Sequence, residues 1–170
     1  EASQAEAWLA WTGVPAVIKA VDARGARRSV RVETLEEASL MLEAAVKIGA
    51  VYLERSVVGA RVVEVPMIGD GEGSVLALGD RDATIRDENR VLLAESVTAD
   101  LGSEVREEIG RHATALAAQL DWHGMVTGRF LLTPDGRPYF LQLRPGIQAW
   151  HGVTEAVLGV DLLDAQLRLA

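Results

Sequence analysis

Residues 137–155 read RPYFLQLRPGIQAWHGVTE and carry more structural information than any other part of the chain. Tyr139, Leu141 and Leu143 alternate with other residues over the first half of this stretch, which predicts a strand. A loop rich in polar groups follows, with Gln142, Arg144, Gln148 and His151 in or beside it. A strand that ends in such a loop is a common way to present reactive groups at a cleft on a rigid support.

The composition is that of an ordinary globular protein. The 170 residues, of which 49% are apolar, are enough for one domain or for two small lobes that share a cleft. The net charge of -8 argues against nucleic-acid binding, which relies on cationic surface. Without cysteine the chain has no disulfide or thiolate metal site, and no apolar run approaches the roughly 20 residues of a membrane span. We therefore expect a cytoplasmic protein with no membrane or nucleic-acid partner.

Two hairpins and three helices are expected in the half of the chain that contains the opening stretch. Residues 126–132 and 137–143 are apolar runs on either side of Pro134, Asp135 and Gly136, which predicts an antiparallel hairpin. The other elements expected in this half of the chain are strands at 61–68 and 74–78 joined at Asp70-Gly71, an extended excursion at 81–93 that returns to the sheet, a helix that begins at Ser103, and short helices at 153–158 and 162–169.

The first part of the chain predicts a smaller unit. Thr34 and Glu37 have the spacing of a capping box and Gly49 follows the last periodic residue, so we expect a helix over 35–48. Lys19 is a lone charge inside an apolar strand and should point into a cleft or meet an acid. The apolar stripe of the helix comprises Leu35, Ala38, Leu42, Ala45, Val46 and Ile48; the other expected elements are a helix at 3–11 with Ser3 as N-cap and strands at 15–21, from 29 and at 51–57.

Several strings of the sequence resemble one family along almost the whole chain. GVPAVIKA, VYLER, DGRPYFLQLRPGIQ and GVDLLDAQLRLA are similar to the ATP-grasp part of biotin carboxylase, a component of biotin-dependent acyl-CoA and pyruvate carboxylases. The resemblance is collinear from about residue 13 to 170. It implies an α+β ATP-grasp fold with antiparallel sheets in two lobes, a small one at 1–57 with the N-terminal helix and a large one at 58–170.

The resemblance covers only the middle of a biotin carboxylase. The N-terminal domain of the family and its C-terminal part have no counterpart in these residues. We therefore expect the partners to be the remaining domains or subunits of a carboxylase-like assembly, with biotin supplied only by a partner domain.

Part of a nucleotide pocket is implied by the resemblance, so that ATP is an expected ligand. In the family a strand lysine grips the nucleotide phosphate, an acid and the hinge strand border the adenine, and a glycine-rich loop closes over the phosphates. The matching positions are Lys19 for the phosphate, Glu54, Val57 and Leu131 around the adenine, Gly25 and Arg27 in the loop, and Gln148 for bicarbonate.

The resemblance also implies that the catalytic positions are changed. The magnesium ligands of the family fall at Arg129, Gln142 and Arg144, and an arginine cannot supply the oxygen that magnesium demands. The catalytic arginine falls at Gly146 and the general base at Trp150. The other changed positions are Val91 in place of a bicarbonate-contacting lysine, Arg86 and Asn89 near the ribose, and DARGARR at 22–28 in place of a run of glycines. No magnesium and no catalytic residue are therefore expected.

Arg129 and Arg144 allow two interpretations. As neighbours on adjacent strands, they could hold an anion in place of the missing metal ion, together with Lys19 and the arginines of the 22–31 loop. Gln148 is a further anion-binding candidate. Alternatively, they pair with nearby acids such as Asp80 and Asp82 in a filled cleft.

Three functions stay open at this point. The first is a degenerate domain that serves as a structural or regulatory part of a carboxylase-like protein. The second is an ATP-dependent ligase completed by other domains or subunits. A carboxylate within reach of Arg129 and Gln142 would favour this function, and the candidate acids are Asp80, Asp82 and Glu155. The third is binding of another anion, such as a coenzyme A phosphate.

Two further expectations concern packing. The string HGVTE at 151–155 is expected to cap and pack the closing helix. Trp122 is expected in the core, whereas Trp8 and Trp11 on the first helix could form an apolar face for a neighbouring domain.

Overall fold

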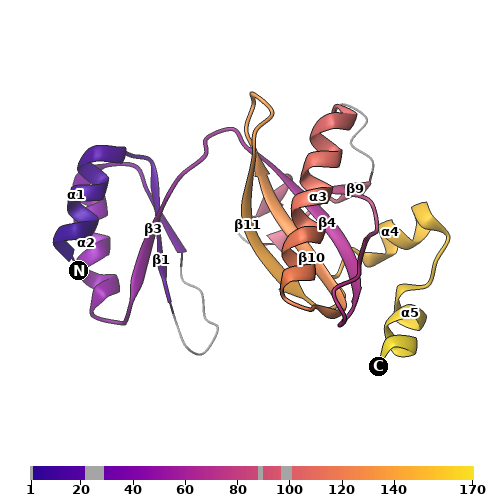
Figure 1. Ribbon diagram of the computed structural model, residues 1–170. Helices are drawn as coiled ribbons and strands as arrows, with labels where there is room; N and C mark the ends of the chain where they lie inside the picture. Colours follow the sequence, from indigo (N-terminus) through magenta and orange to yellow (C-terminus); the bar gives the residue numbers. More distant parts are fainter. Residues whose placement is uncertain (1, 22–28, 88–89, 97–100) are drawn as a thin grey trace. The chain divides into compact units, whose positions relative to one another are not determined.

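The computed structural model describes residues 2–21, 29–87, 90–96 and 101–170 (Figure 1). Helices and antiparallel strands are mixed along the chain, which confirms the α+β prediction. The chain divides into two compact units, the first ending at Val58 and the second beginning at Gly59. Each unit is described by itself.

The first unit is a three-stranded antiparallel sheet covered by two helices. The strands lie in the order β2-β1-β3, with β1 at Ala16–Ala20, β2 at Ser29–Val32 and β3 at Val51–Arg55. The helices α1 (Ala2–Thr12) and α2 (Leu35–Val46) lie against one face of this sheet (Figure 1). The core between them comprises Leu9, Ala16, Ile18, Val32, Ala38 and Leu42.

Helix α2 begins as its capping box predicts. The Thr34 hydroxyl accepts a hydrogen bond from the Glu37 N–H at 3.1 Å, and the Glu37 carboxylate accepts one from the Glu33 N–H at 2.8 Å. The predicted apolar stripe is only partly correct, because burial is confined to the middle of the helix, where it packs on β1. Its outer members Leu35, Val46 and Ile48 are exposed.

Helix α1 differs from the prediction at its start and in its apolar face. It begins at Ala2, so Ser3 lies inside the first turn and is not the N-cap. Trp8 packs against the core of the first unit, while Trp11 is 82% exposed. The apolar face expected from the two tryptophans is thus reduced to Trp11.

The second unit is built on a six-stranded sheet. Its order is β11-β10-β4-β6-β9, and β5 pairs with β4 as a side branch. Both predicted hairpins are confirmed, since β4 pairs with β5 and β10 with β11. The bounds are Arg61–Asp70 for β4, Val75–Ala77 for β5, Arg81–Asp82 for β6, Glu95–Ser96 for β9, His123–Leu132 for β10 and Pro138–Pro145 for β11.

The predicted excursion at 81–93 returns to the sheet. Strand β6 pairs with β4 and with β9, while β7 (Arg86–Asp87) and β8 (Arg90–Val91) form a separate two-stranded ladder. The excursion thereby brings Arg86 and Val91 into register with each other.

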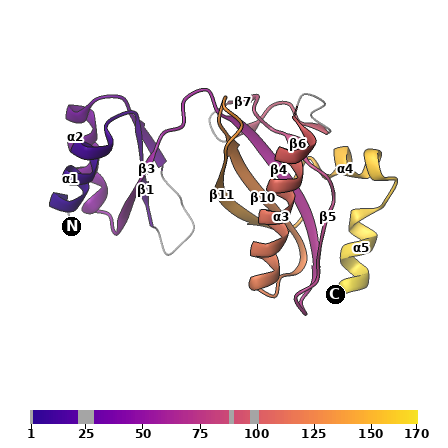
Figure 2. The same cartoon turned by 45° about the horizontal axis from the view of Figure 1, so that its top comes forward.

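Helix α3 (Ser103–Gln119) covers one face of this sheet (Figure 2). It begins at the expected residue, and Trp122 just beyond it packs against the core, as predicted. The core on this face comprises Val63, Val65, Met67, Ile109, Ala113, Ala117, Val126, Phe130 and Leu132. Because side chains alternate along a strand, residues 62, 64 and 66 of β4 face away from α3.

Two short helices close the chain, α4 (His151–Leu158) and α5 (Leu162–Leu169). The Glu155 carboxylate of α4 accepts a hydrogen bond from the Leu162 N–H at 2.8 Å, and Asp161 caps α5 by accepting from the Asp164 N–H at 2.8 Å. The Glu155 bond agrees with the structural role expected for the HGVTE string.

Over the described ranges, no helix has both the length and the apolar content that crossing a bilayer requires.

Candidate functional site

One residue from each of five strands lies in a single row across the second unit, on the face opposite α3. The strand registers pair Gln142 with Arg129, Arg129 with Glu64, Glu64 with Arg81, and Arg81 with Ser96. Residues that lie directly opposite one another on adjacent strands point to the same side of the sheet and interact. The row therefore places two arginines on either side of one glutamate.

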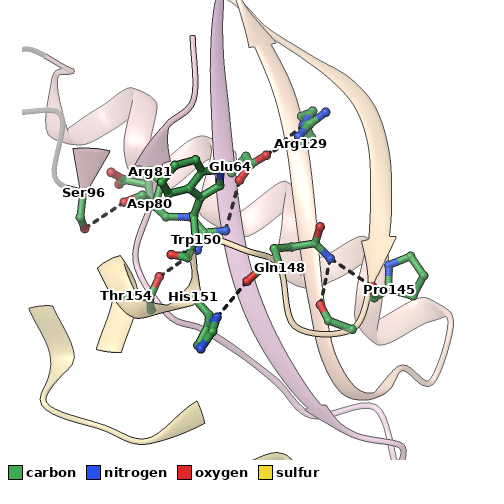
Figure 3. Close-up of polar contacts among 11 residues, drawn as sticks. Glu64, Asp80, Arg81, Ser96, Arg129, Pro145, Gln148, Trp150, His151 and Thr154 are labelled. Atoms are coloured by element: carbon green, nitrogen blue, oxygen red, sulfur yellow. Dashed lines mark hydrogen bonds and ion pairs between the residues drawn. The ribbon is translucent and has the colours of Figure 1, made fainter. Parts of the chain in front are cut away.

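Glu64 is the centre of this row and is only 1% exposed. One carboxylate oxygen accepts from the Arg129 guanidinium, with the Nε atom at 3.1 Å, and the other accepts from Arg81 Nη2 at 3.2 Å (Figure 3). Sequence reasoning missed Glu64 among the candidate acids. Its signal is a single carboxylate in the apolar run RVVEVPM, since an acid in a buried strand needs a charged partner.

Asp80 and Asp82 do not pair with Arg129 or Arg144, so this part of the prediction is wrong. Asp80 accepts from Arg106 Nε at 2.6 Å, and Asp82 accepts from Arg61 Nη2 at 2.8 Å. The reason is the alternation of side chains along a strand, because Arg81 points to the Glu64 row and its two neighbours point the other way. Glu155, the third candidate acid, contacts the start of α5, as described above.

Arg144 and Arg86 are half-buried and are electrostatically part of the same site. Arg144 lies opposite Thr127, two residues along its strand from Gln142. Burial lowers the pKa of both Arg86 and Arg144, the nearby charge of Arg129 lowers it further, and Glu64 acts in the opposite direction. We call the group of Arg81, Arg86, Arg129 and Arg144 around Glu64 the arginine cluster.

Arg81 also connects the row to the last loop. Its Nη1 atom donates to the Trp150 carbonyl at 2.9 Å and to the Thr154 hydroxyl at 3.3 Å (Figure 3). The pKa of Arg81 is lowered by burial, against the raising effect of Glu64. The Trp150 side chain packs with Leu131 against a small apolar cluster, so Trp150 has a structural role where the resemblance implies a lost base.

The loop after β11 is held by its own backbone. Gly146 has a φ of +77°, a left-handed conformation that favours glycine, and its N–H donates to the Met125 carbonyl at 2.9 Å. The Gln148 amide donates to the carbonyls of Pro145 and Gly146, each at 3.1 Å (Figure 3). Gln148 thus folds onto its own loop in this structure, and its role as an anion ligand stays a prediction.

In the first unit, Lys19 meets an acid, which is one of the two outcomes expected for a lone charge in a strand. Its Nζ atom lies 2.6 Å from Glu54 Oε2 and 5.7 Å from the centre of the Tyr52 ring. Val57 is half-buried between β3 and the end of the unit. The nucleotide roles of these residues stay predictions.

The other predicted positions are in the second unit or outside the described residues. Leu131 is half-buried beside Val62 and Trp150, and Val91 is buried in the same apolar cluster. Gly25, Arg27 and Asn89 lie outside the described residues.

The charged groups described on this face are the arginine cluster and Glu64. Among the described residues, no three His, Cys, Asp or Glu side chains gather as a metal-binding group. Magnesium takes oxygen ligands, mainly carboxylates, and the carboxylate of Glu64 already accepts from two guanidinium groups. Guanidinium groups form strong, often paired hydrogen bonds with phosphate and carboxylate.

Comparison with known proteins identifies clear relatives. Residues 1–170 match the family described as the ATP-binding domain of the carbamoyl-phosphate synthase L chain. The chain is 37% identical over 165 residues to biotin carboxylase of Nostoc sp., covering 93% of this chain and 37% of that protein. It thus spans well under half of the length of this relative.

Two solved structures are similar over 99% of the chain and 39% of their own. One is biotin carboxylase of Campylobacter jejuni in a β-γ-ATP complex, with a TM-score of 0.89 and 26% identity. The other is the biotin carboxylase domain of Hydrogenobacter thermophilus 2-oxoglutarate carboxylase with MgADP, ADP and bicarbonate, with a TM-score of 0.88 and 28% identity.

Proposed function

Because this chain belongs to the family of the carbamoyl-phosphate synthase L chain ATP-binding domain and has the ATP-grasp fold of biotin carboxylase, we propose that it is a biotin-carboxylase-like domain without carboxylation activity. It acts as a structural or regulatory part of a larger carboxylase-like protein or complex. Residual binding of a nucleotide or another anion belongs to this proposal. Since the chain spans a minor part of its relatives, the remaining domains or subunits of such an assembly are the expected partners.

The observation that carries the proposal is the pairing of Glu64 with Arg129 and Arg81. Phosphoryl transfer depends mainly on positioning and on neutralisation of phosphate charge by a metal ion. At the positions that the resemblance assigns to metal ligands, the sheet presents Arg129, Gln142 and Arg144. The acid next to them is held by two guanidinium groups, so the residues present do not fit a magnesium ion.

The pair of Lys19 and Glu54 in the first unit supports the part of the proposal that concerns residual nucleotide binding. Lys19 and Glu54 match two positions of the nucleotide pocket and lie in contact. A phosphate that binds Lys19 has to compete with Glu54 for the same ammonium group. We expect nucleotide binding through this pair to be weak for that reason.

An ATP-dependent ligase completed by other domains or subunits is the second candidate. One observation favours it, since Glu64 is a carboxylate within hydrogen-bond distance of Arg129 and in the same row as Gln142. The similar domain of 2-oxoglutarate carboxylase has been solved with MgADP and bicarbonate. For this function Glu64 has to exchange its arginine partners for a metal ion.

Release of ADP from ATP separates the two candidates. The assay contains bicarbonate, free biotin or a biotinylated carrier domain, and a high magnesium concentration, and a Lys19→Ala variant prepared in the same way controls for contaminating ATPases. The proposal predicts the same background rate for both proteins. ADP release that depends on bicarbonate and is abolished in Lys19→Ala would establish the ligase function instead.

A further inference from the structure

A pocket of about 260 Å³ lies in the second unit, between the sheet and the first half of α3. Its apolar wall includes Val65 of β4 and Ala77 of β5, and its polar wall includes Asp80, Arg106 and Glu107. Val65 belongs to the core that packs against α3, whereas the arginine cluster lies on the opposite face of the sheet. The pocket is therefore separate from the candidate site, and what it binds does not depend on the proposed function.

Asp80 brings an unsatisfied carboxylate oxygen to the wall of this pocket. The residue is 8% exposed, and its Oδ2 atom accepts from Arg106 Nε at 2.6 Å. Its backbone carbonyl accepts from the Ser96 hydroxyl at 3.2 Å (Figure 3). Its Oδ1 atom is buried and, among the residues that the structure describes, has no hydrogen-bond partner. A buried carboxylate oxygen without a donor costs free energy, so a donor that enters the pocket is stabilised there.

The α3 side of the pocket leaves room for such a donor. Gly110 lies in the interior of α3 and lines the pocket. A Cβ atom added to Gly110 would meet no heavy atom of the described residues within 4 Å. Glycine inside a helix is less favourable than alanine, and local packing gives no reason for a glycine at this place. Its missing side chain instead keeps this side of the pocket open.

The charges of the wall favour a cationic donor. Asp80 and Glu107 each contribute a carboxylate, and Arg106 contributes a guanidinium that is already bonded to Asp80. One negative charge is thus in excess among the described side chains of the wall. An ammonium group combines N–H donors with a positive charge, and it forms strong hydrogen bonds with carboxylates.

We propose that this pocket binds a small aliphatic ammonium compound. Its N–H group donates to Asp80 Oδ1, and its hydrocarbon part lies against Val65, Ala77 and the bare backbone of Gly110. Glu107 is exposed at the rim, where its charge attracts the ligand but is screened by salt. Asp80 sets the position of the ammonium group, because its Arg106 and Ser96 contacts hold the carboxylate in place.

A titration with butylammonium chloride tests the ligand class. The amide NMR signals of the isotope-labelled chain are followed while sodium chloride keeps the ionic strength constant. We expect saturable shifts at Gly79 and Gly110, which line the pocket. Tetramethylammonium carries the same charge without an N–H group and should shift these signals far less. No saturable shift with butylammonium would overturn the proposal and leave a pocket that holds water only, and equal shifts with both compounds would overturn it in favour of unspecific attraction of cations.

Substitution of Asp80 tests the carboxylate. Asp80→Asn is expected to weaken butylammonium binding by about tenfold or more, the effect of losing one charge-assisted hydrogen bond. The matched control is Asp82→Asn, because Asp82 forms the same kind of pair, accepting from Arg61 Nη2 at 2.8 Å. The control should bind butylammonium as tightly as the unchanged chain does.

A second variant covers the case in which Asp80→Asn does not fold. Gly110→Leu fills the pocket from α3 without removing a charge, and it should abolish the saturable shifts. Its matched control is Gly152→Leu, since Gly152 is another helical glycine at which an added Cβ would meet no described atom within 4 Å. This control should retain the binding. Unchanged affinity in either Asp80→Asn or Gly110→Leu, measured on folded protein, would overturn the proposal.

Discussion

Replacing Glu64 with glutamine should destabilise the second unit by about 3–5 kcal/mol, the usual result of removing one partner from a buried ion pair. Glu64 is 1% exposed and lies between two buried guanidinium groups. Glutamine keeps the shape of the side chain but removes the negative charge. Arg81 and Arg129 are then buried with no carboxylate between them.

The magnitude follows from the bonds that are lost. The carboxylate accepts two hydrogen bonds from Arg129 and one from Arg81. Each hydrogen bond to a charged group contributes about 1.5–3 kcal/mol. The glutamine carbonyl still accepts from one arginine, so the loss is smaller than the sum of three bonds and falls in the stated range.

Urea denaturation followed by tryptophan fluorescence measures this change. Trp8 and Trp11 are replaced by phenylalanine in all variants, so that Trp122 and Trp150 report on the second unit. The control is Asp87→Asn, which removes an exposed pair with Arg90 and should cost less than about 1 kcal/mol. A loss of less than about 1 kcal/mol in Glu64→Gln would refute the view that Glu64 is the buried counter-charge of the cluster.

Three further predictions concern individual side chains that accept hydrogen bonds. Burial raises the pKa of Asp82, but hydrogen bonds from Thr84 and Arg61 and the charge of Arg61 together outweigh it, so the pKa lies below its ordinary value of 3.8. The folded state therefore gains stability from the ionised Asp82 carboxylate above about pH 4 and loses this stability as the pH falls through the lowered pKa. The urea midpoints of Asp82→Asn and the unchanged chain should consequently differ at pH 7 and converge in acid. Thr154→Val removes one of the two acceptors of the buried Arg81 Nη1 atom, which keeps the Trp150 carbonyl, and should cost about 1–3 kcal/mol in the same urea assay. An unchanged midpoint would show that the contact with Thr154 does not contribute to stability. Thr34→Ala removes the N-cap of α2 and should cost about 1 kcal/mol, measured by circular dichroism during urea unfolding, with Thr34→Ser expected to retain the stability.

Local patterns in the sequence predict the secondary structure of this chain well. Capping at Thr34, the turn at residues 134–136 and the alternation in residues 137–143 each depend on neighbours a few residues away. The hairpins follow directly, because two strands joined by a tight turn have their register set by that turn. The acid partner of Lys19 was one of the two outcomes that the sequence allowed, since a charge inside a strand is expected to point into a cleft or to meet an acid.

The composition of the site could not be predicted in the same way. The sequence places Arg129 next to Gln142 through the β10–β11 hairpin, but Glu64 reaches Arg129 only because β4 pairs with β10, across 65 positions of the chain. Residue identity and spacing within a segment do not specify which strands become neighbours in a sheet. Asp80 and Asp82 are equally acidic and close to Arg81 in sequence, yet both point to the other face.

The sequence by itself therefore determined the elements, the family resemblance and the presence of arginines where that resemblance places metal ligands. The tertiary structure alone decided what these arginines do. It buried Arg129 against Glu64 and left Arg144 half-exposed, although both belong to one hairpin and carry the same charge. The physical reason is that the partner of a buried charge is chosen by the register of strands distant in sequence, whereas helices, turns and caps are chosen by residues within a few positions.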